Sequence, residues 1–355
     1  MADLGIKVTI VTRAESGGQR IGAFDLIRIP RRAGLTEDLS WAFSVRRAVA
    51  AVSPDVVLAA EWRHPALACT FGARTWAVVT CLAGSLAQLR RLGREHRRDR
   101  QVLRVATRLL GERLQTTRAD AIIAPSEAVL DWASRLWPIS ANPTRVIPNC
   151  VDLKLLQKNA PAARPAGYPI EGRSVVFVGR LDTQKGVDVL VEAMLGVWNR
   201  VPDARVVLIG WGPRSTMEEI RHRVRASAGR LYILGPRPHD EVCAALARAA
   251  VVVAPSRWEA FGLSALEAIA LGRPVVATSG SGFESFLESE RNALLVPPGD
   301  ASGLAAAIIR LLRDKGLAQR LGDGGRADAH AYDSPLIARR YLAFFREILA
   351  LRDSA

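Results

Sequence analysis

The segment SVVFVGRLDTQKGVDVLVEAMLGVWNRVPDARVVLIG (174–210) decides the fold class of this 355-residue chain. It contains two nearly continuous runs of apolar, mostly β-branched residues, SVVFVG (174–179) and RVVLIG (205–210). Such runs are typical of parallel strands that helices cover on both faces. Apolar residues at helical spacing in DVLVEAMLGVWNRV (188–201) predict a helix between the two strands. The segment is therefore predicted to be a strand–helix–strand unit of an α/β domain.

Similar runs extend this pattern in both directions along the chain. Further strands are predicted at 6–12, 55–60, 75–80, 120–125 and 144–149, and at 230–235, 250–255 and 273–278. Helical patterns lie between most of them, for instance in DEVCAALARAA (240–250). Five strands in each half, with helices between them, predict two doubly wound, Rossmann-like α/β domains. Ligands of such paired sheets are expected at the carboxyl ends of the strands, in the cleft between the domains.

The ends of the first domain are less regular. Residues 158–172 are rich in Pro, Ala and Gly and are predicted to be a linker between domains 1–157 and 173–334. At the start, ADLG (2–5) resembles the last turn of a helix, and IKVTIVT (6–12) then follows as a second strand. We therefore expect the first strand of this domain to be missing. Either the true start lies upstream, which we favour, or the domain has been rebuilt.

The composition is that of an ordinary globular protein. Hydrophobic residues make up 49% and charged residues 24%, which argues against disorder. There is no apolar run of about 18 residues and no secretory signal pattern, so a cytoplasmic protein is expected. The cysteines show no CxxC pair or metal-site spacing and are expected to be buried, reduced thiols. They are Cys69, Cys81, Cys150 and Cys243.

The positive charge is concentrated in the first half. The formal net charge is +14, and residues 1–172 hold 25 basic against 15 acidic residues. Within them, residues 86–118 carry ten Arg and three acidic residues, with Leu and Val interleaved. Such a helix could lie on the inner face of an anionic membrane or hold an anionic acceptor, and a solvated helix face is the other interpretation. Nucleic acid is not expected, because no nucleic-acid-binding module accompanies the charge.

The first candidate for chemistry is VFVGRLDTQKG (176–186). It ends a predicted strand at Gly179 and places Arg180 and Lys185 in the following loop and helix start. Two cations at a helix N-terminus, beside glycines that let the backbone approach a ligand, indicate a diphosphate site. Ordinary surface-loop charges are the alternative.

The second candidate is APSRWEAFGLSALEAIALGRPVVAT (254–278). Glu259 precedes a predicted helix and Glu267 lies within it, eight residues later, among apolar neighbours. Two such carboxylates are unusual unless a ligand satisfies them, and sugar hydroxyls can donate to both. The helix start also offers a phosphate three backbone N–H groups, those of Phe261, Gly262 and Leu263.

The stretch from Val176 to Asp300 resembles the donor domain of glycosyltransferase family 4, retaining enzymes of the GT-B architecture. The motifs that carry the resemblance are GRLDTQKG (179–186), LIGWGP (208–213), EAFGLSALE (259–267), GRPVVAT (272–278) and NALLVPPGD (292–300). Weaker likeness covers nearly the whole chain, including the hinge motif IPNCVD (147–152). The final helix resembles the one that crosses back to the first domain, so residues 335–355 are expected to pack there.

The resemblance implies transfer of a sugar, with retention, from a nucleotide-sugar such as a UDP- or GDP-sugar. It implies that Arg180 and Lys185 bind the donor diphosphate and stabilise the leaving nucleotide. Glu267 would hold the ribose, and Glu259 would contact the sugar hydroxyls. Family members need no metal, so no metal and no cofactor are expected.

The chain departs from the family on the acceptor side. The Gly-rich turn after the first strand is absent with that strand. Cys81 and Leu82 stand near the position where the family often has a His, and Cys150 stands where the hinge motif usually has Gly. His64 and His96 are too far along the chain to replace that His and are expected to be surface residues.

Three functions remain open on these grounds. The favoured one is a sugar transferase with a lipid-linked, polysaccharide or anionic acceptor. The second is an N-terminally truncated or non-catalytic protein that binds a nucleotide-sugar. An oxidoreductase is disfavoured, because no GxGxxG turn follows a strand with an acidic residue about 20 positions later.

Overall fold

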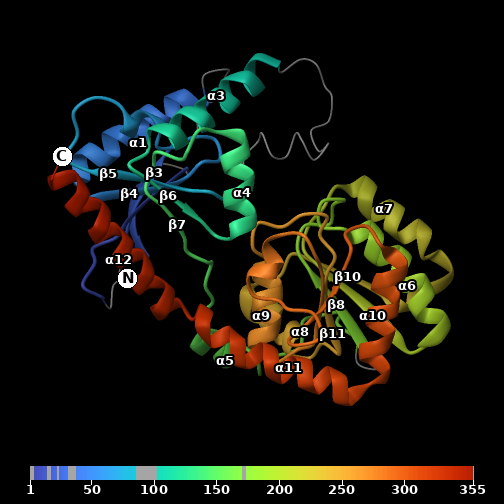
Figure 1. Cartoon of the computed structure of the whole chain (residues 1–355). Coiled ribbons are helices and arrows are strands. Elements are labelled where there is room, and N and C mark those ends of the chain that lie inside the picture. The colour runs from blue at the N-terminus through green and yellow to red at the C-terminus, as the bar shows by residue number, and fades with distance from the viewer. Residues whose placement is uncertain are drawn as a thin grey trace. The chain divides into compact units, whose positions relative to one another are not determined.

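The computed structural model describes residues 4–13, 17–21, 24–30, 37–84, 102–169 and 173–354. The chain forms two compact units (Figure 1). The first contains Met1–Pro148 and Ile337–Ala355, and the second contains Asn149–Leu336. The division between them falls after Pro148, and the predicted linker 158–172 lies inside the second unit.

The second unit is built on a six-stranded parallel sheet. Its strands, in spatial order, are β10 (Leu231–Gly235), β9 (Ala204–Ile209), β8 (Arg173–Val178), β11 (Val251–Ala254), β12 (Val275–Thr278) and β13 (Leu294–Val296). The chain moves outward from β8 to β10 and then returns to the other side of β8 with β11. The order therefore reverses between β8 and β11, which makes this the switch point of the sheet.

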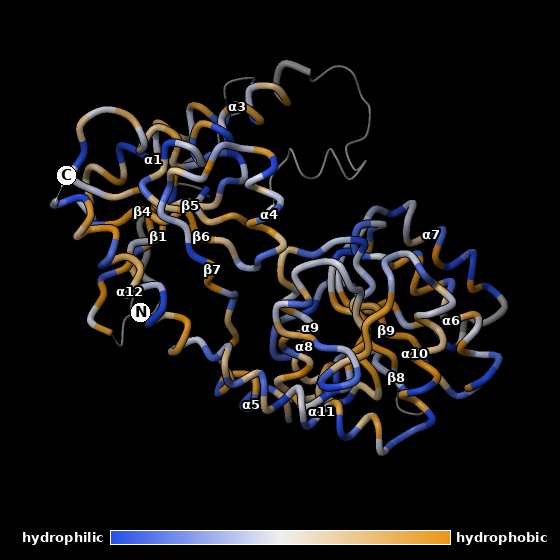
Figure 2. Tube along the Cα trace, in the orientation of Figure 1, coloured by the Kyte–Doolittle hydropathy of each residue, from blue (hydrophilic) through white to orange (hydrophobic). Residues whose placement is uncertain are grey.

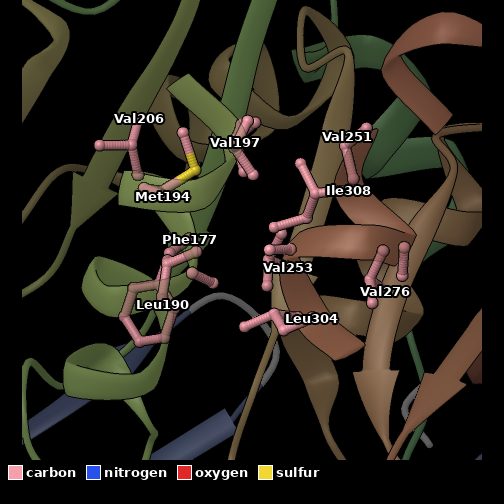
Figure 3. Packing of buried hydrophobic residues seen from close by; sticks show 14 of the residues in the cluster. Phe177, Leu190, Met194, Val197, Val206, Val251, Val253, Val276, Leu304 and Ile308 are labelled. Carbon is pink, nitrogen blue, oxygen red and sulfur yellow. The ribbon is translucent and has the colours of Figure 1, made fainter. Parts of the chain in front are cut away.

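Helices cover both faces of this sheet. Alternate strand residues point to opposite sides, and apolar residues on both sides are buried against helices. One face packs against α6 (Val187–Arg200) and α10 (Ala301–Arg313). Figure 3 shows this side, where Phe177 and Val253 meet Leu190, Met194 and Ile308. The other face packs against α8 (His239–Ala247) and α9 (Leu263–Ala270). The remaining helices are α5 (Leu153–Asn159), α7 (Arg214–Arg223), α11 (Lys315–Ala329) and the short η4 (Arg225–Arg230), η5 (Gly282–Ser285) and η6 (His330–Tyr332).

The first unit contains two sheets. A four-stranded parallel sheet has the order β4 (Val56–Ala60), β5 (Ala77–Cys81), β6 (Ala121–Ala124) and β7 (Thr144–Val146). A three-stranded sheet has the order β1 (Thr9–Arg13), β3 (Phe24–Ile29) and β2 (Gly17–Ile21), with β1 parallel and β2 antiparallel to β3.

The four-stranded sheet is also covered on both faces. Val57 and Val78 pack against Val45 and Val49 of α1 (Glu37–Val52). The opposite face packs against the C-terminal helix α12 (Ser334–Asp353) through residues that include Phe344. Figure 2 shows the apolar residues gathered along the strands of each unit. The other helices are η2 (Leu67–Thr70), α3 (Val102–Arg118) and α4 (Glu127–Leu136).

The two sheets of the first unit share one apolar cluster but not their hydrogen bonds. Val11 of β1 packs into the same cluster as Val57 of β4. Within the described residues, β1 pairs only with β3 and β4 pairs only with β5. Ile10 and Leu58 are 40% and 45% exposed. Among the described strands, β1 and β4 are thus edge strands, each with a hydrogen-bonded neighbour on one side only.

The prediction of a doubly wound α/β fold is confirmed, and a strand is present at each of the ten predicted places. Three strands, β2, β3 and β13, were not predicted from the sequence. The expectation that all cysteines are buried is wrong for Cys150, which is exposed, while Cys81 is half-buried. In the described parts of the chain, no helix is long and apolar enough to cross a membrane.

Candidate functional site

The candidate site of the second unit lies at the switch point of its sheet. Gly179, Arg180 and Lys185 follow β8, and the loop after β11 carries Glu259. The two loops touch at Gly186, which has a φ of +69°. A Cβ placed there would lie 1.9 Å from a backbone carbonyl oxygen, so only glycine allows this approach. The sheet order thus brings together segments that are about 75 residues apart in sequence.

Lys185 and Glu259 form an ion pair. Nζ of Lys185 lies 2.5 Å from Oε2 of Glu259, and the Ser256 hydroxyl donates to the same oxygen at 3.2 Å. The side chains are 24% and 17% exposed. Each charge therefore neutralises the other, while both side chains can still be reached from solvent. A diphosphate can bind Lys185, and a sugar hydroxyl can donate to Glu259.

Arg180 lies at the rim of the same site. Its Nε is 3.1 Å from Oδ2 of Asp182, and its guanidinium also donates to Gln184 at 2.9 Å. The other carboxylate oxygen of Asp182 accepts the backbone N–H of Lys185 at 2.9 Å. The loop is thus shaped by its own side chains just before α6 begins. Because Arg180 is 45% exposed, its guanidinium is open to an anion at this helix N-terminus.

Arg257 fastens the loop after β11 to α6. Its guanidinium donates to both oxygens of Asp188, at 2.8 and 2.7 Å, and its backbone N–H donates to the Gln184 carbonyl at 2.9 Å. Burial disfavours the charge of Asp188, but the hydrogen bonds from Arg257 outweigh it and hold the pKa of Asp188 below its ordinary value. This clamp, the pair of Arg257 and Asp188, was not predicted from the sequence.

The start of α9 is set by Gly262. Its φ is +105°, and a Cβ there would lie 2.2 Å from the ring of Phe283. Phe261 is a core residue, 1% exposed, whereas Leu263 is 46% exposed. Within the described residues, no hydrogen bond from the N–H groups of Gly262 and Leu263 is found. These groups are therefore available to a phosphate, as expected for a helix start.

Glu267 lies on α9 and pairs with a residue that the sequence analysis missed. Its Oε1 is 3.0 Å from Nε2 of His239, and the side chain of Glu267 is 17% exposed. His239 begins α8, and three residues separate it from the end of β10. That position, at the carboxyl end of a strand, was the available signal for a site residue.

No metal site accompanies these residues. Among the side chains that the structure describes, no group of three or more His, Cys, Asp or Glu residues is placed to hold a metal ion.

The first unit holds a buried carboxylate at the carboxyl end of β4. Glu61 is 1% exposed and accepts hydrogen bonds from the N–H groups of Ala83 and Gly84 at 2.7 to 2.9 Å. Burial raises the pKa of Glu61 to about 7, although these hydrogen bonds favour the ionised form. Glu61 therefore fixes the loop that follows β5.

Three arginines converge on the first turn of α1 beside this loop. Arg13 donates to Glu37 at 2.7 Å, and Arg108 of α3 donates to Asp38 at 2.6 Å. Arg63 lies 3.0 Å from the same Asp38 carboxylate. Burial opposes the charge of Asp38, but Arg108 and the other arginines outweigh it and lower its pKa. Arg108, which belongs to the Arg-rich segment 86–118, thus forms an ion pair within the first unit.

The expectation that His64 is a surface residue is wrong. Its side chain is 1% exposed and packs so closely on Gly111 of α3 that a Cβ there would lie 2.4 Å from the ring. Burial lowers the pKa of His64 to about 4, so the ring is neutral at pH 7. Residues 86–101 of the Arg-rich segment, which include His96, lie outside the described residues.

The two units have the doubly wound α/β architecture of the GT-B fold, and the second carries cations and carboxylates at its strand switch point. Residues 1–155 match the family model "Glycosyltransferase Family 4", and residues 172–314 match "Glycosyl transferases group 1". The chain therefore belongs to glycosyltransferase family 4, as its motifs predicted.

Curated relatives share this family. The chain is 32% identical to a phosphatidyl-myo-inositol mannosyltransferase of Mycobacterium leprae over 62% of its length. It is also 32% identical to a D-inositol 3-phosphate glycosyltransferase of Acidothermus cellulolyticus over 70% of its length. The match covers 58% of the length of each of these two relatives.

Solved structures share the fold. Sucrose-phosphate synthase of Thermosynechococcus elongatus matches with a TM-score of 0.79 and 26% identity, covering 99% of this chain and 91% of that one. The Anabaena protein HepE in complex with UDP matches with a TM-score of 0.70 and 20% identity, covering 91% of this chain and 86% of that one.

Proposed function

We propose that the chain transfers a sugar from a nucleotide-sugar to an acceptor with retention at the anomeric carbon, and that it needs no metal. The observation that carries this proposal is the pairing of Lys185 with Glu259 at the switch point, with Arg180 at the rim. Cations at a helix start are suited to the diphosphate, and the adjacent carboxylate is suited to the sugar hydroxyls.

The proposed roles follow the charges of the site. As the bond between the sugar and the diphosphate breaks, negative charge develops on the departing phosphate. Lys185 and Arg180 lie close enough to stabilise that charge without a metal ion. Binding of the diphosphate would draw Lys185 from Glu259, and the released carboxylate would then accept hydroxyl groups of the sugar. Glu267 would bind the ribose.

For the acceptor we propose a lipid-linked or phosphate-bearing molecule. Two observations support this choice: the basic first half of the chain, and the phosphoinositol compounds in the names of both relatives. α3 also presents Leu110, 55% exposed, near the exposed Arg113. An apolar side chain beside a cation is suited to an anionic membrane surface, so we propose peripheral binding there.

The donor site is tested by calorimetric titration of UDP, GDP, ADP and TDP into the parent chain and an Arg180→Ala, Lys185→Ala variant. We expect one nucleotide to bind the parent and the double variant to lose at least about 100-fold in affinity, because each charge-assisted hydrogen bond is worth about 1.5–3 kcal/mol. Arg214→Ala is the control, since this side chain is 91% exposed and only pairs with Glu218 along α7. Equal affinity of parent and double variant would refute the donor site.

Transfer is then tested with the sugar conjugate of the nucleotide that binds and phosphatidylinositol vesicles as acceptor. Consumption of the donor with an α-linked product from an α-linked donor supports a retaining transferase. The contrary outcome is that the donor binds without being consumed when a panel of lipid and phosphorylated acceptors is supplied. That result would favour the non-catalytic nucleotide-sugar-binding protein.

A further inference from the structure

His239 contacts one of the candidate carboxylates, Glu267, and the proposed function gives it no role. It begins α8 after the sequence Pro236–Arg237–Pro238, and its Nε2 lies 3.0 Å from Oε1 of Glu267 on α9. The contact links the loop after β10 to the helix after β11. These two elements reach the same edge of the sheet from opposite sides of β8.

The contact fixes the imidazole ring as well as the carboxylate. Two prolines restrict the backbone before the ring, because each sets its own φ near −65°. One turn further along α8, the sulfur of the fully buried Cys243 lies 3.7 Å from Nδ1 and 3.8 Å from Nε2 of His239. With an acceptor oxygen opposite Nε2, that nitrogen carries the proton.

The carboxylate of Glu267 keeps capacity for a ligand. Its Oε1 accepts from His239, and no other side-chain hydrogen bond to Glu267 is found within the described residues. An ionised carboxylate has about four acceptor sites on its two oxygens. The two vicinal hydroxyls of a ribose supply two donors. His239 leaves Oε2 free for them and restricts rotation of the carboxylate.

We propose that His239 is a positioning residue that orients Glu267 toward the ribose hydroxyls, and that this pair makes the site prefer ribonucleotides to 2′-deoxyribonucleotides. The proposal rests on the proposed nucleotide-sugar function. According to this proposal, His239 affects recognition of the ribose of the nucleotide and does not affect binding of the diphosphate. A purely structural contact between α8 and α9 would change the stability of the fold but not this discrimination.

The test measures calorimetric affinities for UDP, 2′-deoxy-UDP and inorganic pyrophosphate, or for the matching set if another base binds. The variants are His239→Ala, His239→Gln and the control His222→Ala, an exposed His on α7. For His239→Ala we expect UDP affinity to fall roughly fivefold to tenfold, and 2′-deoxy-UDP and pyrophosphate affinities to change less than about twofold. His239→Gln keeps an N–H donor and should restore most of the loss. His222→Ala should match the parent.

A second arm separates positioning from direct contact. In a Glu267→Gln background, His239→Ala should have no further effect on UDP affinity, because the group that it orients has been altered. If UDP binds the parent but His239→Ala weakens UDP and 2′-deoxy-UDP equally, or weakens neither, the role of His239 is refuted while the donor site stands. If no nucleoside diphosphate binds the folded parent, the proposed function fails first.

Discussion

Glu61 provides a quantitative test of the electrostatics in the first unit. Its carboxylate is buried and carries a pKa of about 7, against 4.5 for an exposed glutamate. Between these values the folded protein keeps a proton that the unfolded chain releases, so the contribution to stability is complete below pH 4.5 and is lost as the pH rises through 7. Because one pKa unit is worth about 1.4 kcal/mol, we expect stability to fall by roughly 2.5 kcal/mol from pH 5 to pH 8 through this group.

The change to make is Glu61→Gln, which keeps a carbonyl oxygen for the Ala83 and Gly84 amides but does not titrate. Hydrogen exchange of the β5 amides is measured for both proteins at pH 5 and pH 8, and comparison at the same pH cancels the intrinsic exchange rate. Relative to the variant, the parent should lose roughly 2.5 kcal/mol of opening free energy at the higher pH. Glu218→Gln, on the exposed surface of α7, is the control. The same pH dependence in parent and Glu61→Gln would mean that Glu61 is ionised throughout, and would refute the reasoning.

Three further predictions concern the second unit. Gly186→Ala, which puts a Cβ 1.9 Å from a backbone carbonyl, should cost at least about 3 kcal/mol in urea unfolding, whereas Gly280→Ala, with positive φ but open space, should cost about 1 kcal/mol. Equal costs would show that the loops do not touch. Ile308→Ala should cost about 2–5 kcal/mol because the side chain is fully buried, and Leu195→Ala, 42% exposed, should cost less than about 1 kcal/mol. Arg257→Ala removes a partly exposed ion pair, so the loss of stability should be only about 1 kcal/mol, yet UDP affinity should fall because the Glu259 loop loosens. Unchanged affinity would contradict the clamp.

The fold was predictable because its strands are short, apolar runs with clear breaks. SVVFVG and RVVLIG pack on both faces and therefore leave a strong pattern in the sequence. β3, FDLIRI, was missed because its polar Asp25 and Arg28 interrupt the apolar run. The order and register of the strands were known only from the structure, because nothing in the sequence of β8 specifies that β11 lies beside it.

The site was predictable where its chemistry is local. Arg180 and Lys185 lie in one loop, and Glu259 and Glu267 lie on one short segment. The ion pair between Lys185 and Glu259 joins residues 74 positions apart, so sequence spacing could not reveal it. The same holds for His239, which reaches Glu267 only because α8 and α9 pack together.

His64 shows a different kind of error. His64 was expected at the surface because it lies too far along the chain to replace the family's His, but a glycine on α3 makes room for its ring. The residue that decides its burial, Gly111, is 47 positions away. The space available in the interior depends on the packed tertiary structure, so it cannot be predicted from the type of a single residue.

Within the part of the chain that the structure describes, β1 and β4 each have one edge without a strand partner, which affects how the protein behaves in solution. Backbone N–H and C=O groups on such edges are a template onto which another extended segment can add, whether from a second molecule or from an added peptide. Ile10 and Leu58 are exposed on these same strands, so an added segment would also find apolar contacts. Within the first unit, β1 and β4 are therefore the strands at which self-association should begin as the concentration rises. Conditions that keep its many arginines mutually repulsive, meaning low salt, should delay that association.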